Sequence, residues 1–340
     1  MGGDYPDLQD PNTGLLGIDL EEQGGFYRIE RIYRGDKWSP GKAGPLSMPG
    51  LGVKQGDYIL SVDGVELRAP DNPYRLLEGT AGRSIEIVVS ASRSPDNARK
   101  ITVEPVEDEG SLRMWEWVLN NQSRVDEASG GRLAYVWLPN TSRRGYELFH
   151  RMYFAQQDRE GAIIDSRDNG GGLLADNVLD ILDRKLMGYW NSRGEETKPW
   201  PQPMAALFGP KVMIINEGAG SGGDLLPYLF RRRGIGPLVG TRTWGGTVGS
   251  AGTQPQLIDG GAFLAPAYGF FDTDGNWAVE GVGVAPDIEV RNDPKAVISG
   301  GDPQLEAAVR EGLRLLETEQ VILRERQPAP PLRWRRPESQ

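Results

Sequence analysis

The chain has 340 residues, with 48 acidic and 38 basic side chains and a formal net charge of −10, which argues against nucleic acid or an anionic membrane as its main partner. It has no cysteine, which excludes disulfides, thiolate zinc sites and a cysteine nucleophile. No stretch is apolar enough for a membrane span and the N-terminus lacks the apolar core of a signal peptide, so we expect a cytoplasmic protein of about two domains.

After an N-terminal extension at residues 1–12, residues 13–106 have the pattern of a small β-rich domain. Short apolar segments alternate with glycine and proline turns, which is typical of strands, and a short helix is expected at residues 74–77. The expected strands are residues 15–20, 26–33, 58–62, 85–90 and 101–106.

Three motifs of this first domain occur in a recognisable order. They are the loop Gly14-Leu15-Leu16-Gly17 before residues 18–20, the segment 52–60, and residues 61–64. Over about the first 106 residues the chain resembles a PDZ domain. The resemblance implies that the amides of the Gly14–Gly17 loop capture the terminal carboxylate of a peptide, which then lies along the next strand. The alternative is a spacer or lid whose groove is blocked.

Residues 107–320 form the second predicted domain, in which strands alternate with helices as in an α/β unit with a mostly parallel or mixed sheet. Residues 111–121 fit a helix or a docking strand. Strands are expected at 133–138, 162–165, 212–215 and 238–240, and helices at 144–158, 175–186, 224–230 and 302–317, the last capped by Asp302. Residues 321–340 are rich in proline and arginine, and we expect them to be disordered.

Ser221 is the one hydroxyl in a glycine-rich turn between an apolar strand and a helix. The sequence Ala219-Gly220-Ser221-Gly222-Gly223 has the pattern of a nucleophile elbow, with alanine in place of the first glycine. The Gly222 amide would lie near the helix N-terminus, where it can stabilise an oxyanion. The alternative is an anion-binding loop with a capping serine.

A second glycine turn, Asn169-Gly170-Gly171-Gly172, follows the strand expected at 162–165. The carboxyl ends of parallel strands meet at one edge of a sheet, where α/β folds bind ligands. We therefore expect one amide of this triple-glycine turn to join that of Gly222 in an oxyanion hole.

Four blocks of the second domain, in this order, resemble the C-terminal-processing and tricorn group of serine peptidases, and their details favour the tricorn branch. The blocks are residues 165–172, 216–224, 241–246 and 279–287. The resemblance implies a ClpP/crotonase-like α/β domain with Ser221 as nucleophile. It also implies that Gly171 or Gly172 supplies the oxyanion amides together with Gly222, and that Glu280 belongs to the network that orients the base. It further implies acyl-enzyme cleavage of oligopeptides or unfolded segments, without metal or cofactor, in a hexameric homo-oligomer.

The general base is the point at which the chain departs from this pattern. The C-terminal-processing branch uses a lysine, but no lysine occurs between Lys211 and Lys295, and Gly246 stands about where it would fall. The only histidine, His150, lies in an apolar and aromatic segment and is interpreted as structural. In tricorn-type peptidases the histidine comes from a segment before the PDZ domain, so we expect this chain alone to be weakly active or inactive. The alternative is a non-hydrolytic peptide-binding module.

Other charged residues fit structural roles. Asp165 and Arg167 are expected to form an ion pair, and Asp224 to cap its helix. Asp57 and Asp63 fit turns. Residues 231–233, three arginines, fit a solvated helix end, or a site for a substrate carboxylate in an oligomer.

Overall fold

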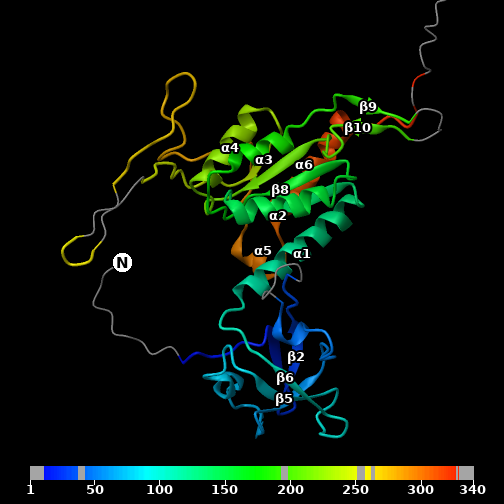
Figure 1. Cartoon of the computed structure of the whole chain (residues 1–340), viewed down its shortest axis with the longest axis vertical. Coiled ribbons are helices and arrows are strands. Elements are labelled where there is room, and N and C mark those ends of the chain that lie inside the picture. The colour runs from blue at the N-terminus through cyan, green and yellow to red at the C-terminus, as the bar shows by residue number, and fades with distance from the viewer. Residues whose placement is uncertain are drawn as a thin grey trace, which may run out of the picture. The chain divides into compact units, whose positions relative to one another are not determined.

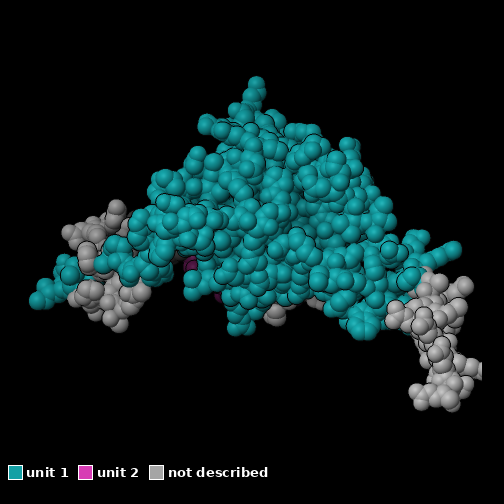
Figure 2. All heavy atoms as spheres, turned by 90° about the horizontal axis from the view of Figure 1, so that it is seen from above, with its two compact units in different colours: residues 1, 121–340 teal, residues 2–120 magenta. Residues whose placement is uncertain are grey.

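The computed structural model describes residues 11–36, 43–192, 198–250, 257–261, 265–326 and 328. Their contacts divide the chain into two compact units, residues 2–120 and residues 121–340 (Figure 2). Most of the predicted extension at 1–12 and of the predicted disordered tail at 321–340 lies outside the described residues.

The first unit contains an antiparallel sheet in the order β1-β2-β3-β5-β6, with β4 paired to β3 (Figure 1). Its strands are β1 (Ile18–Gln23), β2 (Phe26–Ile32), β3 (Tyr58–Val62), β4 (Val65–Glu66), β5 (Ile85–Ser90) and β6 (Arg99–Val103). Two short 3-10 helices, η1 (Pro45–Ser47) and η2 (Pro73–Leu77), accompany the sheet. The strand expected at 15–20 begins later, because Gly17 has a φ of +68° and breaks the extended chain before Ile18.

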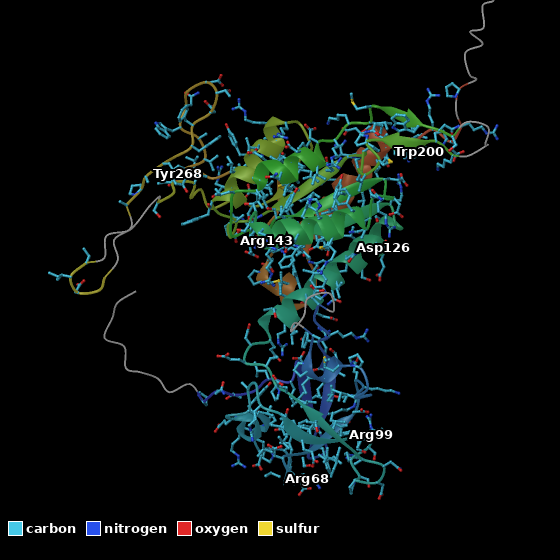
Figure 3. The ribbon with its side chains drawn as sticks, in the orientation of Figure 1. Arg68, Arg99, Asp126, Arg143, Trp200 and Tyr268 are labelled. Carbon is cyan, nitrogen blue, oxygen red and sulfur yellow. The ribbon has the colours of Figure 1, made fainter. Side chains whose placement is uncertain are left out.

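The core of this unit comes from one face of the sheet. Along β5, Ile85, Ile87 and Val89 are buried while the residues between them are partly exposed, as expected for a strand with one covered face. Asp57, in the turn before β3, pairs at 3.0 Å with Arg99, which is labelled in Figure 3. Asp63 lies in the turn after β3 and accepts a hydrogen bond from the Glu86 amide at 2.8 Å.

The second unit contains a parallel five-stranded sheet in the order β13-β12-β11-β8-β7. Its strands are β7 (Leu133–Trp137), β8 (Gly161–Asp165), β11 (Lys211–Ile215), β12 (Leu238–Gly240) and β13 (Ile288–Glu289). Every residue of β8 and β11 is buried, which is typical of parallel strands covered on both faces. A separate hairpin of β9 (Gly188–Trp190) and β10 (Trp200–Gln202) was not predicted, and Trp200 is labelled on it in Figure 3.

Six helices are described: α1 (Gly110–Ser129), α2 (Arg143–Phe154), α3 (Ala175–Leu182), α4 (Gly222–Arg232), α5 (Pro294–Ile298) and α6 (Pro303–Glu319). Helix α6 packs against β7, β8, β11 and β12, and α3 packs against α4 (Figure 1). The Leu305 amide donates to the Asp302 carboxylate at 3.1 Å, so Asp302 caps α6 as predicted. The segment at 111–121, for which a helix or a strand was open, is part of α1.

Helix α2 ends four residues earlier than the sequence predicted. Gln156 follows the end of the helix. Its buried side chain forms hydrogen bonds with the backbone N–H and C=O of Tyr135 in β7. Apart from such boundaries, the predicted fold class is confirmed: a β-rich first unit is followed by an α/β unit built from alternating strands and helices.

Candidate active site

Ser221 lies on a sharp corner between β11 and α4. Its backbone has φ 58° and ψ −119°, a sparsely populated conformation that costs on the order of 1–3 kcal/mol and that persists only where the surroundings impose it. The Ser221 carbonyl accepts hydrogen bonds from the amides of Asp224 and Leu225, both at 3.0 Å, which fixes the corner to the first turn of α4. The residue is exposed.

The glycines around Ser221 are required by close approaches of other backbone. A Cβ at Gly222 would lie 2.1 Å from the carbonyl oxygen of Gly172, and one at Gly223 would lie 2.3 Å from that of Asn169. A Cβ at Gly220 would lie 2.7 Å from the indole of Trp244. These glycines are therefore explained by the tight packing of the serine turn, residues 216–223, against neighbouring atoms that leave no room for a Cβ.

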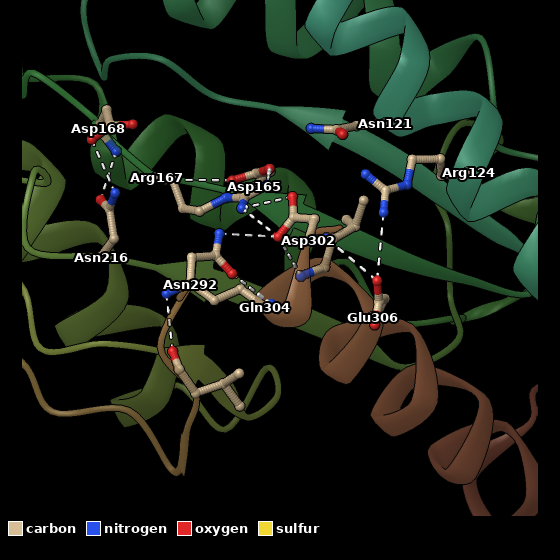
Figure 4. Close-up of polar contacts among 12 residues, drawn as sticks. Asn121, Arg124, Asp165, Arg167, Asp168, Asn216, Asn292, Asp302, Gln304 and Glu306 are labelled. Carbon is tan, nitrogen blue, oxygen red and sulfur yellow. Dashed lines mark hydrogen bonds and ion pairs between the residues drawn. The ribbon is translucent and has the colours of Figure 1, made fainter. Parts of the chain in front are cut away.

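The triple-glycine turn, residues 169–172, lies directly against the serine turn at the carboxyl edge of the sheet. A Cβ at Gly171 would lie 2.7 Å from the Cβ of Ser221. Two polar links join the turns: the Gly220 amide donates to the Asn169 carbonyl at 3.0 Å, and Asp168 and Asn216 exchange hydrogen bonds at 2.8 and 2.9 Å (Figure 4). The structure thus brings together the two turns that the sequence placed at one sheet edge.

Asn169 determines which amides of the triple-glycine turn are free. Its buried side chain donates to the Leu138 carbonyl at 3.0 Å and accepts from the Gly171 amide at 2.9 Å. The Gly170 amide donates to the Pro139 carbonyl at 3.0 Å. Among the described residues, no acceptor is found for the amides of Gly172 and Gly222, which leaves these two donors open beside Ser221.

Asp224 connects the serine turn to the loop after β12. It lies in the first turn of α4, as predicted, and is fully buried. Its carboxylate accepts from the amides of Gly245 and Gly246, at 2.8 and 3.0 Å, and does not cap its own helix as the sequence predicted. The clue in the sequence was an acidic residue three positions after the serine and two glycines after Trp244. Spacing alone did not indicate that these groups meet.

Glu280 is held by the same loop. One oxygen, Oε2, accepts from the amides of Thr247 and Val248, both at 2.6 Å, and from the Thr247 hydroxyl at 3.2 Å. The Val248 and Thr247 amides lower the pKa of Glu280, so its carboxylate is ionised at neutral pH. No described residue donates to the other oxygen, Oε1. Val279, the residue directly before Glu280, is buried and has φ 74°, an outlying conformation for a β-branched residue.

The predicted ion pair of Asp165 and Arg167 is part of a larger buried network (Figure 4). Arg167 lies 2.6 Å from Asp165 and 2.9 Å from Asp302, and the Tyr135 hydroxyl donates to Asp165 at 2.9 Å. Burial opposes the charge of Arg167, but the two carboxylates raise its pKa above the ordinary value. The network ties the end of β8 to the cap of α6, which is a structural role.

His150 lies on α2 within an aromatic cluster. Its ring centroid is 4.4 Å from that of Tyr146 and 5.2 Å from that of Phe154. Its Nε2 is buried and has no hydrogen-bond partner among the described residues. Burial, and then Arg184, lower its pKa. These surroundings agree with the structural role that the sequence predicted.

The three arginines at 231–233 are paired within the unit. They lie 3.1 Å from Asp287, 3.6 Å from Asp272 and 2.7 Å from Asp180, respectively. Within the part of the chain that the structure describes, no group of three or more histidine or carboxylate side chains could hold a metal ion, and no helix is long and apolar enough to cross a membrane.

In the first unit, the predicted peptide-binding loop is engaged by the chain itself. The Gly14 amide donates to the Leu77 carbonyl at 2.8 Å and the Leu15 amide to the Val106 carbonyl at 2.7 Å. The Gly17 amide donates to the carboxylate of Glu109 at 3.1 Å. Of the four amides in this loop, that of Leu16 alone has no acceptor among the described residues.

Comparison with known families finds two matches. Residues 14–108 match the family "Tricorn protease PDZ domain". Residues 132–290 match the family "Peptidase family S41".

Individual relatives match across both units. The chain is 38% identical over 305 residues to tricorn protease homolog 1 of Streptomyces coelicolor, and 33% identical over 323 residues to tricorn protease of Thermoplasma volcanium. These alignments cover 89% and 95% of this chain but 28% and 31% of those proteins, so the chain spans about a third of their length. A crystal structure of the tricorn protease matches with a TM-score of 0.84 at 32% identity, covering 94% of this chain and 30% of that one.

Proposed function

Because the chain belongs to the tricorn protease family, within the serine-type S41 peptidases, we propose that it carries the nucleophile and the oxyanion hole of a serine peptidase. The observation that carries the proposal is the geometry at Ser221. An exposed serine stands on a strained corner beside two open amides, those of Gly172 and Gly222. A capping serine needs neither the strain nor the open donors.

In the proposed reaction, the Ser221 oxygen attacks the carbonyl carbon of a peptide bond. The carbonyl oxygen takes up the negative charge and accepts hydrogen bonds from the amides of Gly172 and Gly222. The serine proton passes to a base and then to the departing amine, which leaves an acyl-enzyme that water hydrolyses. Gly171 supports this site through its contact with Ser221 and not as a donor, because its amide is bound to Asn169.

Glu280 is proposed to orient the base. Its Oε2 is fixed by the amides of residues 247 and 248, and its Oε1 is left to accept the N–H of an imidazole. The base itself is proposed to be a histidine from outside these 340 residues, because the one histidine present lies in the aromatic cluster of α2. A segment preceding the PDZ-like unit, in cis or as a separate polypeptide, fits the family pattern.

The substrates are proposed to be oligopeptides or unfolded segments, and the assembled protein is proposed to be a cytoplasmic hexameric ring, both by family resemblance. The ring has a simple test in the chain itself. Light scattering at micromolar concentration should give a mass of about six chains if these residues contain the ring contacts, and a clean monomer would show that they do not.

An activated serine can be tested with a fluorophosphonate probe. We expect the probe to label the chain at Ser221, faintly by itself and faster when a peptide carrying the missing histidine segment is added. The labelling should disappear in Ser221→Ala and persist in the control Ser299→Ala, which removes an exposed serine after α5. If no label appears at high probe concentration with the segment present, the chain is a non-hydrolytic peptide-binding module.

A further inference from the structure

The carboxylate of Glu109 lies where the first unit was expected to bind the terminal carboxylate of a peptide. Glu109 directly precedes α1, and its Oε2 accepts the hydrogen bond of the Gly17 amide at 3.1 Å. The Glu109 side chain is only 13% exposed. A carboxylate is therefore already bound at this loop, and it belongs to the chain.

Arg113 fixes this carboxylate in place. It lies one helical turn after Glu109, and its Nε donates to Glu109 Oε1 at 2.8 Å. The same guanidinium lies 2.8 Å from Asp19 of β1 and 4.3 Å from the ring centroid of Tyr33. Arg113 thus links the first turn of α1 to Asp19 in β1 and to Tyr33 directly after β2, so the position of Glu109 does not depend on one hydrogen bond.

An aliphatic side chain accompanies the carboxylate. Leu112 is 2% exposed, and its Cδ1 lies 3.1 Å from the position that a Cβ of Gly17 would take. Gly17 has φ +68° and no side chain, which gives Leu112 its room. A carboxylate on the amide and a buried aliphatic group beside it are the two features that a peptide ending in leucine would offer to the same loop.

We propose that the segment from Glu109 to Arg113, which leads into α1 and forms its first turn, is an internal ligand of the PDZ-like unit. A peptide with a free terminal carboxylate reaches the Gly17 amide only after Glu109 has left it. The amides of Gly14 and Leu15 donate to Leu77 and Val106, so the loop donors left for a terminal carboxylate are those of Leu16 and Gly17, and Glu109 occupies Gly17. The inference concerns peptide binding and does not depend on the chemistry of Ser221.

A binding experiment tests the competition. The full chain with Ser221→Ala, which prevents cleavage, is titrated into a fluorescein-labelled peptide library with randomised residues before a terminal leucine. We expect Glu109→Ala to bind the free-acid library about tenfold or more tightly than the parent chain. In this variant no internal carboxylate competes with the peptide for the Gly17 amide. The same library ended by an amide should show no gain.

The matched control is Glu107→Ala, which removes the same charge two residues earlier at an exposed position without a described hydrogen bond. It should bind like the parent. Equal affinity of the parent and Glu109→Ala for the free-acid library would overturn the proposal. Glu109→Leu, which keeps a similar side-chain size but has no acceptor oxygen, replaces Glu109→Ala if that variant unfolds.

Amide hydrogen exchange at Gly17 provides a second, peptide-free readout. We expect this amide to be protected in the parent and in Glu107→Ala, and to exchange at least about tenfold faster in Glu109→Ala, where its acceptor is gone. An unprotected Gly17 in the parent would show that Glu109 does not occupy the loop. If Gly17 is released but no variant binds the library, the loop is not a receptor for carboxylates and the proposal is wrong.

Discussion

The chain has two glycine-containing loops that read alike in the sequence and differ in the structure. Both the Gly14–Gly17 loop and the triple-glycine turn were predicted to present bare amides to a carboxylate or an oxyanion. In the first, Glu109 fills the position at Gly17. In the second, Asn169 takes one amide and leaves that of Gly172 open beside Ser221. Glycines let the backbone approach, but the neighbouring side chains decide whether the donors are available.

The largest effect should come from closing the open loop. Gly222→Ala would place a methyl group 2.1 Å from the Gly172 carbonyl and 2.3 Å from the Thr141 hydroxyl, and the clash would displace the donors. We expect fluorophosphonate labelling of Ser221 to slow by about 10²–10³-fold, the usual cost of losing one oxyanion donor.

Gly170→Ala is the control for this substitution, because a Cβ at Gly170 has no atom within 4 Å. It should label at nearly the parental rate, and circular dichroism should confirm that both variants fold. Equal rates for the two variants would mean that the open amides are not part of the reactive site.

The next effect concerns what keeps the open loop in position. Asp224→Asn weakens the two hydrogen bonds from Gly245 and Gly246 inside a fully buried site, and turns its amide group toward one of those donors. We expect the free energy of unfolding to fall by about 1–3 kcal/mol in urea denaturation. Asp176→Asn, in the exposed first turn of α3, should change it by less than about 0.5 kcal/mol.

A smaller effect, in pH dependence, tests whether the histidine takes part in either loop. Burial and Arg184 lower the pKa of His150, so the folded state binds its proton less readily than the unfolded state does. The resulting stability is complete above the unfolded pKa of about 6.5 and is lost as the pH falls through the lower folded pKa. Between about pH 7 and pH 5, the free energy of unfolding of His150→Phe should fall less than that of the parent chain. Labelling of Ser221 should be unchanged in this variant. A loss of labelling in this variant would make His150 the base.

The smallest effect is expected at Thr141, whose buried hydroxyl lies beside Gly222 without a hydrogen-bond partner among the described residues. Thr141→Val replaces that hydroxyl with a methyl group of similar size. The free energy of unfolding should stay the same or rise by about 1 kcal/mol, because an unsatisfied polar group is removed. If Thr141→Val instead lowers the free energy of unfolding by more than about 1 kcal/mol in thermal unfolding, the hydroxyl has a hydrogen-bond partner.

Much of the second unit followed from the sequence because its signals are local. An apolar run of four residues before a glycine turn marked β11, and the equivalent pattern marked β8, which was enough to bring Ser221 and the triple-glycine turn to one sheet edge. The cap of α6 was visible as Asp302 followed by proline. In each case the residues that determine the element lie within a few positions of one another.

The parts that could not be predicted depend on residues far apart in the chain. Gly17 and Glu109 are 92 residues apart, and Gly245 is 21 residues from Asp224. Motif spacing indicates which atoms a turn exposes but does not identify the group that arrives from another element. For the same reason the sequence left Gly171 and Gly172 as equal candidates, since only the fold shows Asn169 bound to one of them.

The bond between Arg167 and Asp302 also has a consequence for the order of events during synthesis. Asp302 is translated 135 residues after Arg167, which at roughly 5–20 residues per second is a delay on the order of ten seconds. During this interval the arginine two residues before Asn169 lacks one of its two buried counter-ions, so the end of β8 has not reached its final packing. The final packing at the end of β8, next to the triple-glycine turn, is therefore expected only after Asp302 has been synthesised.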